Sequence, residues 1–364
     1  MKKVFLYAYD QINLGDDLFI YAIVKRYSNV KFYIWSNRSN KMIFKKLKNL
    51  KVIDKDSRFA KILKRIYASL LPRYKSWYEK RCDAVVYIGG SIFIEYDNWK
   101  QILSWWQFEA KKYSFYVIGA NFGPYKSEDY KKQLQQILEQ MKDVCFRDQY
   151  SYAMFKDCHN VRYAPDILFS LPMPSVQIVK NRVFISVIDC RYKEEGANKL
   201  EGFSSVYLEN MTELIKEYLL NHFTVVLCSF CRKEGDERAV SEIVKMLGDN
   251  IPKEKVQTLF YTGKNLYDIL QTLASSEYVI ASRFHATILG IAAEKPVFPI
   301  VYSDKTARVL QDIGFQGNYA DIRTKRKITY GFSLKNLSDN YILPMKDLQR
   351  EAEKHFIELD KVLR

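Results

Sequence analysis

Several features that mark particular classes of protein are missing from the sequence. No run of about 18 uncharged apolar residues is present, so the chain is not expected to span a bilayer. Only four histidines occur among 364 residues. The closely spaced cysteines Cys228 and Cys231 have no second Cys or His pair at suitable spacing nearby, which argues against a zinc or redox site. We therefore expect no metal or redox site at these cysteines, and we expect no cofactor.

The composition is that of a globular protein with anionic partners. Hydrophobic residues make up 48% of the chain, and its length is sufficient for two domains. The net charge of +15 favours phosphates, nucleic acid or an acidic membrane surface as partners. Because no DNA-recognition helix or RNA-binding motif accompanies this charge, we do not expect a nucleic-acid partner.

Much of the basic excess lies between Asn40 and Arg81, where Lys and Arg alternate with Leu, Ile, Tyr and Trp. This pattern predicts either a solvated helical face or a face that rests on acidic lipid headgroups. The apolar run at the N-terminus is interrupted by Asp10 and Asp16, too early for a secretion signal. We expect a cytoplasmic protein, bound peripherally at the inner face of the plasma membrane in the second interpretation.

Short apolar runs alternate with longer helical patterns, which is typical of parallel sheets covered by helices. The alternation breaks between Pro165 and Arg182, a stretch with three prolines, and then restarts. We therefore predict an α/β fold with two Rossmann-like, doubly wound domains, 1–175 and 176–325. A tail over 326–364 carries one more predicted helix, 345–363, which we expect to pack back across the joint. The predicted strands are 3–9, 30–36, 83–90, 114–123, 143–148, 183–189, 223–230, 256–261, 277–282 and one beginning near Pro299.

Ligands of open parallel sheets bind beyond the carboxyl ends of the strands, where helix N-termini present unpaired amides. The first candidate at such a position is LGDD, Leu14 to Asp17, which follows the first predicted strand. Gly15 permits a close backbone turn there. Asp16 and Asp17 are candidates to cap the helix that follows.

A second candidate is YIGGSIF, Tyr87 to Phe93, in which a strand runs into two glycines and a serine. The backbone amides of Gly89, Gly90 and Ser91 are candidates to hold an anion. Tight packing explains the same glycines equally well.

A third candidate is the pair Arg147 and Asp148, which interrupts an apolar strand where a helix begins. One interpretation is a mutual ion pair at the surface. The other is contact with a ligand, because a charge that ends a buried strand is costly unless it is paired.

A fourth candidate is ASRFHATILGIAAEKPV, Ala281 to Val297, where a strand meets a helix of small residues. Arg283 and His285 lie around the N-cap, where the helix dipole opposes a cation and favours a bound anion. Lys305 follows the next strand, one helix-and-strand unit later, so His285 and Lys305 should reach the same edge of adjacent strands. We expect a cationic cluster of Arg283, His285 and Lys305.

Taken in order, these motifs resemble the polysaccharide pyruvyl transferase family over most of residues 1–325. The most specific part is Ser282-Arg283-Phe284-His285, followed by a proline and then Tyr-x-x-Lys ending at Lys305. The resemblance implies two Rossmann-like domains facing across a cleft, as in GT-B glycosyltransferases. It also implies metal-free transfer of a pyruvyl group from phosphoenolpyruvate to a sugar as a ketal. The matching segments are LGDD, IGGS, FRDQYS, PDILF, SRFHATILGIAAEKPV and YSDK.

The resemblance implies that phosphoenolpyruvate is held by Arg147, His285 and Lys305, with Arg283 as their neighbour. Phosphoenolpyruvate carries a carboxylate and a phosphate on a small skeleton, so it needs several cations in one place. The remaining residues expected to contact substrate are Gly89, Gly90, Ser91, Ser282 and Asp166.

For the chemistry, His285 is the candidate proton donor to the methylene carbon, because an ordinary histidine pKa near 6.5 permits donation at neutral pH. The candidates to activate a sugar hydroxyl are Asp16, Asp17 and Asp166. The arginines and Lys305 would neutralise the departing phosphate.

Two other functions fit the same sequence. In a GT-B glycosyltransferase that uses a nucleotide sugar, the basic residues would hold a diphosphate and Glu294 would reach a ribose. In a non-catalytic glycan-binding protein, aromatic residues such as those of Asn98 to Phe108 would stack on sugars, although packing in the core explains these tryptophans as well. For the transferase, the basic and aromatic N-terminal half favours an undecaprenyl-linked acceptor at the membrane.

Overall fold

The computed structural model describes residues 1–9, 11–37, 43–66, 70–192, 194–195, 198–248, 251–252, 254–324, 331, 333–334 and 345–364. These residues form two compact units. The first unit comprises Met1–Gln11, Asp16–Ile167 and Arg350–Arg364, and the second comprises Ile12–Gly15 and Leu168–Gln349. The chain thus passes between the units after residue 167, where the sequence predicts a boundary after 175. Most of the predicted tail before residue 345 lies outside the described residues.

The first unit is built on a parallel sheet in the order β3-β2-β1-β4-β6-β7-β8, with β5 paired to β6. The central strands are buried on both faces, as expected for apolar runs in a parallel sheet. Strand order reverses between β1 and β4, which makes the carboxyl ends of these two strands the topological switch point. The strands are β1 (Lys3–Tyr7), β2 (Lys31–Ser36), β3 (Leu50–Asp54), β4 (Ala84–Ile88), β5 (Ser91–Phe93), β6 (Phe115–Phe122), β7 (Asp143–Phe146) and β8 (Val161–Tyr163).

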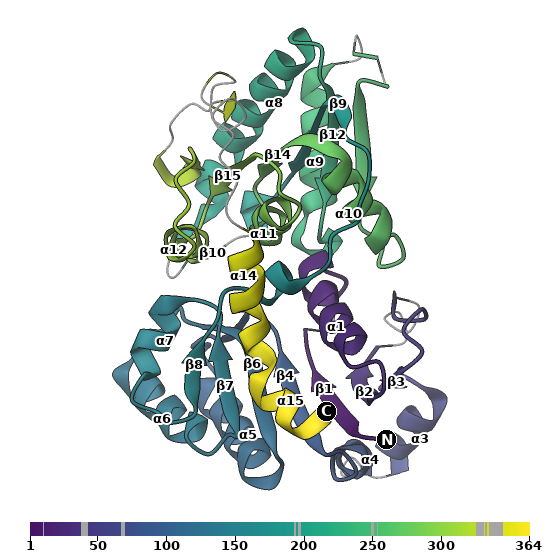
Figure 1. Cartoon of the computed structure of the whole chain (residues 1–364), viewed down its shortest axis with the longest axis vertical. Coiled ribbons are helices and arrows are strands. Elements are labelled where there is room, and N and C mark those ends of the chain that lie inside the picture. Colours follow the sequence, from purple (N-terminus) through teal and green to yellow (C-terminus); the bar gives the residue numbers. More distant parts are fainter. Residues whose placement is uncertain are drawn as a thin grey trace. The chain divides into compact units, whose positions relative to one another are not determined.

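Helices cover both faces of this sheet. The C-terminal helices cross one face beside α1 (Figure 1), where Tyr27 donates a hydrogen bond to Asp360 and its ring meets Phe356 edge to face. On the other face, α4 and α5 pack over an aromatic core in which Trp106 is buried and Trp99 and Trp105 are partly buried. These tryptophans therefore pack in the core. The helices are α1 (Leu14–Arg26), α3 (Arg58–Ile66), α4 (Leu70–Glu79), α5 (Trp99–Lys112), α6 (Glu128–Leu138), α7 (Gln149–Phe155), α14 (Met345–Ala352) and α15 (Ile357–Leu363), with short 3-10 turns at Ile167–Ser170 and Glu353–Phe356.

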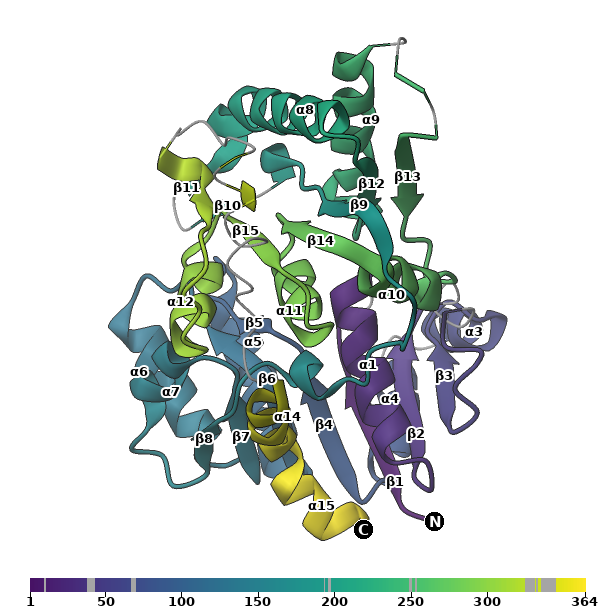
Figure 2. The same cartoon turned by 45° about the horizontal axis from the view of Figure 1, so that its top comes forward.

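The second unit repeats this topology, with a parallel sheet in the order β13-β12-β9-β14-β15-β16. Its switch point lies between β9 and β14. Figure 2 shows α10 and α11 below the strands and α8 and α9 above them, so that helices cover both faces of this sheet as well. The strands are β9 (Val179–Ser186), β12 (Thr224–Ser229), β13 (Val256–Phe260), β14 (Ser276–Ala281), β15 (Val297–Val301) and β16 (Ala320–Asp321); β10 (Glu194–Glu195) and β11 (Asn198–Lys199) form a separate antiparallel pair.

The helices of this unit are α8 (Ser204–Leu220), α9 (Asp236–Leu247), α10 (Leu266–Ser275), α11 (Phe284–Ala292) and α12 (Asp304–Asp312), with 3-10 turns at Cys190–Tyr192, Leu200–Phe203, Arg232–Glu234 and Ile322–Thr324. The prediction of two Rossmann-like, doubly wound sheets is confirmed. Within the described part of the chain, every helix is too short or too polar to cross a bilayer.

Candidate functional site

The switch point of the second unit brings Ser282 and Arg283 to the end of β9. The Ser282 amide donates to the Ser186 carbonyl over 3.3 Å, and the Arg283 amide donates to Ser186 Oγ over 3.1 Å. Ser282 Oγ itself accepts a hydrogen bond from the buried Tyr207 hydroxyl at 2.9 Å. The Ser282 hydroxyl thus fixes the backbone against the core. Contact of Ser282 with substrate stays a prediction.

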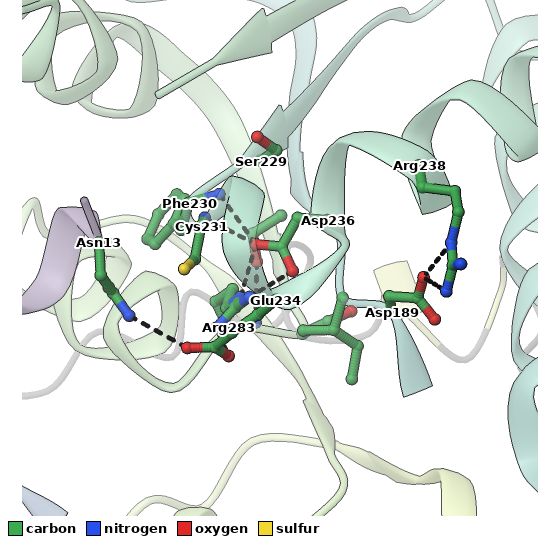
Figure 3. Close-up of polar contacts among 12 residues, drawn as sticks. Asn13, Asp189, Ser229, Phe230, Cys231, Glu234, Asp236, Arg238 and Arg283 are labelled. Atoms are coloured by element: carbon green, nitrogen blue, oxygen red, sulfur yellow. Dashed lines mark hydrogen bonds and ion pairs between the residues drawn. The ribbon is translucent and has the colours of Figure 1, made fainter. Parts of the chain in front are cut away.

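Arg283 is the N-cap residue of α11, and its side chain turns into a buried ion-pair network (Figure 3). Its Nε donates to Asp236 Oδ2 over 2.8 Å, a second nitrogen donates to Asp236 Oδ1, and the third donates to Glu234 Oε2 over 2.7 Å. Arg283 is 6% exposed and Asp236 is fully buried. Two carboxylates therefore compensate the guanidinium charge, which corrects the prediction of a cationic cluster that includes Arg283. We assign Arg283 a positioning role at this edge.

The same network continues to the start of α1. Glu234 accepts a hydrogen bond from the Asn13 amide at 3.4 Å, and Asn13 Oδ1 accepts one from the Gly15 amide at 3.1 Å. The Asn13 side chain therefore caps α1. Asp236 Oδ2 also accepts from the Phe230 and Cys231 amides at 3.1 and 2.9 Å. The network thus ties the loop before α1 to the loops after β12 and β14 (Figure 3).

Sequence reasoning did not select Asn13, Glu234 or Asp236. The available signal was the segment CRKEGDE, Cys231 to Glu237, where a glycine and clustered acids follow a strand at the ligand-binding edge. Nothing local in that segment indicates that its acids pair with an arginine 47 or more residues away.

His285 lies in the first turn of α11, half-buried, with its ring against Gly15. A Cβ at residue 15 would lie 1.8 Å from His285 Nδ1. Gly15 does not have a positive φ, so the glycine is required for the close approach of the imidazole and not for a tight turn. Gly15 of the LGDD motif and His285 of the RFH motif therefore pack against each other.

Lys305 reaches the same edge from the neighbouring strand, as predicted. β14 and β15 pair in parallel, and Lys305 stands in the first turn of the helix after β15. Its Nζ lies 4.8 Å from the centre of the Phe284 ring, beside His285. Lys305 and His285 are both half-buried, so each retains access to solvent. A small anion at this edge would meet a lysine, an imidazole and the first turns of two helices.

In the first unit, Arg147 follows β7 and is 2% exposed. It donates to Asp166 Oδ2 over 3.0 Å and to Asn121 Oδ1 over 2.7 Å. Asp148 instead caps α7, accepting from the Ser151 amide at 2.7 Å. The interpretation of Arg147 and Asp148 as a mutual surface pair is therefore wrong. Direct contact of Arg147 with a donor substrate stays a prediction.

The glycine loop after β4 packs onto this arginine. A Cβ at Gly90 would lie 2.3 Å from an Arg147 guanidinium nitrogen, whereas one at Gly89 would meet nothing closer than 3.4 Å. Ser91 Oγ donates to Asn121 Oδ1 over 3.2 Å. Tight packing thus accounts for Gly90, and anion binding by the amides of this loop stays a prediction.

The three predicted carboxylates differ in exposure. Asp166 is fully buried in its pair with Arg147, and Asp17 is 1% exposed. Asp16 is half-buried. Because α1 begins at Leu14, Asp16 and Asp17 lie in its first turn, where their charge favours the helix dipole, while Asn13 provides the cap. This corrects the prediction that the two aspartates cap the helix.

The two closely spaced cysteines are buried free thiols. Burial, and to a lesser degree Glu234, raises the pKa of Cys231 to about 11, and burial also raises the pKa of Cys228. Both thiols are therefore protonated at neutral pH, a state that does not favour metal binding or thiol exchange.

Comparisons with known proteins identify the family of this chain. The model of the polysaccharide pyruvyl transferase family matches residues 13–304. The amylovoran biosynthesis protein AmsJ of Erwinia amylovora is 21% identical over 299 residues, 78% of this chain and 72% of that protein.

Two solved structures show the same fold at low identity. The UDP-GlcNAc 2-epimerase of Neisseria meningitidis bound to UDP-GlcNAc superimposes with a TM-score of 0.61 at 10% identity, covering 99% of this chain and 100% of that one. Anabaena HepE in complex with UDP gives 0.57 at 12% identity, covering 99% and 97%. The predicted GT-B-like fold class is thereby confirmed. The match over residues 13–304, which spans the motif segments from Leu14 to Asp304, shows that the chain belongs to the polysaccharide pyruvyl transferase family.

Proposed function

We propose that this protein transfers a pyruvyl group from phosphoenolpyruvate to two hydroxyls of a sugar in a cell-surface polysaccharide or its precursor, forming a ketal. The observation that carries the proposal is the convergence of His285 and Lys305 at the carboxyl ends of adjacent strands. The relative named for amylovoran biosynthesis supports a polysaccharide as the acceptor.

The reaction balances without a further reactant. A proton is added to the methylene carbon of phosphoenolpyruvate, which makes C2 electrophilic, and one sugar hydroxyl oxygen bonds to C2. A second hydroxyl then forms its bond to C2 while the bond from C2 to the phosphate oxygen breaks. The sugar loses two hydroxyl protons. One replaces the proton delivered to the methylene group, and the other protonates the released phosphate.

We assign the chemical steps to residues that are not fully buried. His285 delivers the proton, since an imidazolium can act as a general acid and the half-buried ring is held against Gly15. Lys305 neutralises the phosphate as a point charge. Among the predicted carboxylates Asp16 is the candidate base, because Asp17 and Asp166 are buried. Arg283 acts through its network and keeps α11 in place.

The second candidate is transfer from a nucleotide sugar. It is favoured by the fold alone, since the similar structures are complexes with UDP and UDP-GlcNAc. It needs Glu294 at the ribose. Glu294 follows the C-terminal end of α11 in a left-handed conformation with φ of 54°, whereas His285 stands at the opposite end of that helix. This separation favours phosphoenolpyruvate as the donor.

We extend the proposal to the setting of the enzyme. The acceptor is an undecaprenyl-linked glycan, and the protein acts in the cytoplasm, peripherally bound at the inner face of the plasma membrane. The acidic lipid of that face would complement the net charge of +15.

Thermal unfolding tests the donor. Millimolar phosphoenolpyruvate should raise the Tm of the wild-type protein, because a ligand that binds only the folded state stabilises it. The increase should disappear in Lys305→Ala and persist in the control Lys264→Ala, which removes an exposed lysine of the same unit.

The Tm is also measured with a panel of UDP-linked sugars and with a glycan in the absence of any donor. Stabilisation by a nucleotide sugar alone would assign the protein to the glycosyltransferases. Stabilisation by glycan alone, unchanged in Lys305→Ala, would favour the non-catalytic glycan-binding protein.

A further inference from the structure

Three helices of the first unit carry charge of one sign on their exposed surface. In α3, α4 and α5, the acidic residues are Glu79 and Glu109, which are 1% and 3% exposed. Every exposed charged side chain described on these helices, and on the two residues after α4, is basic. These side chains are Arg58, Lys61, Arg65, Arg73, Lys80, Arg81, Lys100, Lys111 and Lys112.

Large apolar side chains are exposed among these cations. Phe59, Ile62, Trp77 and Phe108 are 54%, 53%, 48% and 54% exposed. The Arg81 guanidinium carbon lies 3.7 Å from the centre of the Trp77 ring. Lys112 Nζ lies 4.4 Å from the centre of the Phe108 ring. Aromatic rings beside cations are the side chains that settle at the interface between lipid headgroups and acyl chains.

A cleft of about 720 Å³ opens between α4 and α5 and is lined by exposed rings and cations of these two helices. Its lining includes Trp77, Trp105 and Phe108 together with Arg73, Arg81 and Lys112. Near its floor the Lys75 ammonium lies 3.2 Å from a carboxylate oxygen of buried Glu79 and 4.6 Å from the centre of the Tyr7 ring. Because Glu79 is paired with Lys75, the groups of the cleft that attract an amphiphilic anion are the basic side chains and the apolar rings of its lining.

We propose that this surface, formed by α3, α4, Lys80, Arg81 and α5, is the site at which the protein binds the acidic phospholipids of a membrane. The arginines and lysines contact lipid phosphates, and Trp77 and Phe108 enter the interface on either side of the cleft. The one-sided charge complements an anionic bilayer, and the exposed rings distinguish a lipid partner from free phosphate. The inference rests on the proposed function only in placing the enzyme beside a lipid-linked acceptor.

Vesicle sedimentation tests this site. The full chain should bind vesicles of phosphatidylcholine with one quarter phosphatidylglycerol, bind phosphatidylcholine vesicles far less, and dissociate at high salt. The triple variant Arg73→Gln/Arg81→Gln/Lys112→Gln should bind the acidic vesicles roughly 100-fold more weakly, because each basic residue contributes about a factor of five to the affinity. The matched control Lys245→Gln/Lys255→Gln/Lys264→Gln removes the same charge from exposed positions of the second unit and should bind nearly as the wild type.

A second variant separates lipid insertion from charge alone. Trp77→Ala/Phe108→Ala keeps every cation and should still lose binding to the acidic vesicles. Equal loss in the matched control, unchanged binding in the aromatic variant, or equal binding to neutral vesicles would overturn the proposal. Phosphoenolpyruvate should still raise the Tm of both cleft variants, which shows that they are folded. If it does so and vesicle binding is nevertheless unaffected, the lipid site is wrong while the proposed function stands.

Discussion

The imidazole of His285 occupies the space that a side chain at Gly15 would need, with Nδ1 1.8 Å from the position of a Cβ. The first unit contains a parallel relationship, since a Cβ at Gly90 would lie 2.3 Å from the Arg147 guanidinium. In each unit a motif glycine is thus explained by a motif side chain that packs on it. The motifs are therefore coupled in pairs, and each glycine is a sensitive position for testing the side chain that packs on it.

Gly15→Ala should displace His285. Overpacking should cost about 1–3 kcal/mol of the free energy of unfolding, and a misplaced proton donor should lower turnover roughly 100-fold. The control is Gly202→Ala, because a Cβ at Gly202 meets no atom within 4 Å. Urea unfolding and transfer assays measure the two effects. Wild-type turnover in a folded Gly15→Ala protein would contradict the role given to His285.

Asp236→Asn should be strongly destabilising. The carboxylate accepts from Arg283 and from the Phe230 and Cys231 amides, and its removal leaves a buried guanidinium with half of its compensation. We expect a loss of about 3–5 kcal/mol in urea unfolding. Glu237→Gln on the same helix is the control, since its pair with the exposed Arg232 should contribute less than about 1 kcal/mol. Equal losses in the two variants would show that Asp236 has no special role.

His355 should make stability fall in acid. It is buried with its ring nitrogen 2.8 Å from the Pro165 carbonyl oxygen, and burial, together with the Arg162 charge, lowers its pKa to about 3. The folded state therefore excludes a proton that the unfolded chain takes up below about pH 6.5, so this contribution is lost as pH falls from there toward 3.

Replacing the histidine should remove this dependence. His355→Gln should flatten the pH profile of the unfolding free energy below 6.5, whereas exposed His159→Gln should leave it unchanged. A His355→Gln profile parallel to wild type would contradict the assignment.

Glu109 should make the free energy of unfolding fall as pH rises, the opposite of the effect of His355. Burial, followed by the Glu79 charge, raises its pKa from 4.5 to about 7. The folded state therefore prefers the protonated carboxyl, and its contribution to stability, present below pH 4.5, is lost as pH rises toward 7. Glu109→Gln should be more stable than wild type at pH 8, by on the order of 2 kcal/mol, with the difference shrinking in acid.

Exposed Glu128→Gln is the control for this comparison. A stability difference between Glu109→Gln and wild type that stays constant from pH 4 to pH 8 would show that Glu109 does not titrate in this range.

Strand periodicity predicted the central strands of both sheets, because apolar runs buried on two faces are local signals. It placed Lys305 and His285 at one edge for the same reason, since the spacing of a helix-and-strand unit fixes where each strand ends. The direction of the Arg283 side chain was not accessible in this way. The direction of this side chain depends on Asp236 and Glu234, which are distant from Arg283 in sequence and lie beside it only in the folded protein.

The segment from Asn40 to Arg81 shows a related limit. Its basic pattern indicated helices, and α3 and α4 are present, but β3 at Leu50–Asp54 pairs with β2 at the sheet edge. β3 has only five residues, LKVID, and lies among lysines, so the local pattern did not separate a short edge strand from the surrounding helices.

Transfer of isotope from the donor tests the central claim most directly. The protein would be incubated with a lipid-linked glycan fraction and either phosphoenolpyruvate labelled in its carbon skeleton or UDP-glucose labelled in the sugar. The account predicts that carbon from phosphoenolpyruvate enters the glycan with one phosphate released per label, and that Lys305→Ala abolishes both. Label entering the glycan from UDP-glucose, with none from phosphoenolpyruvate, would contradict it.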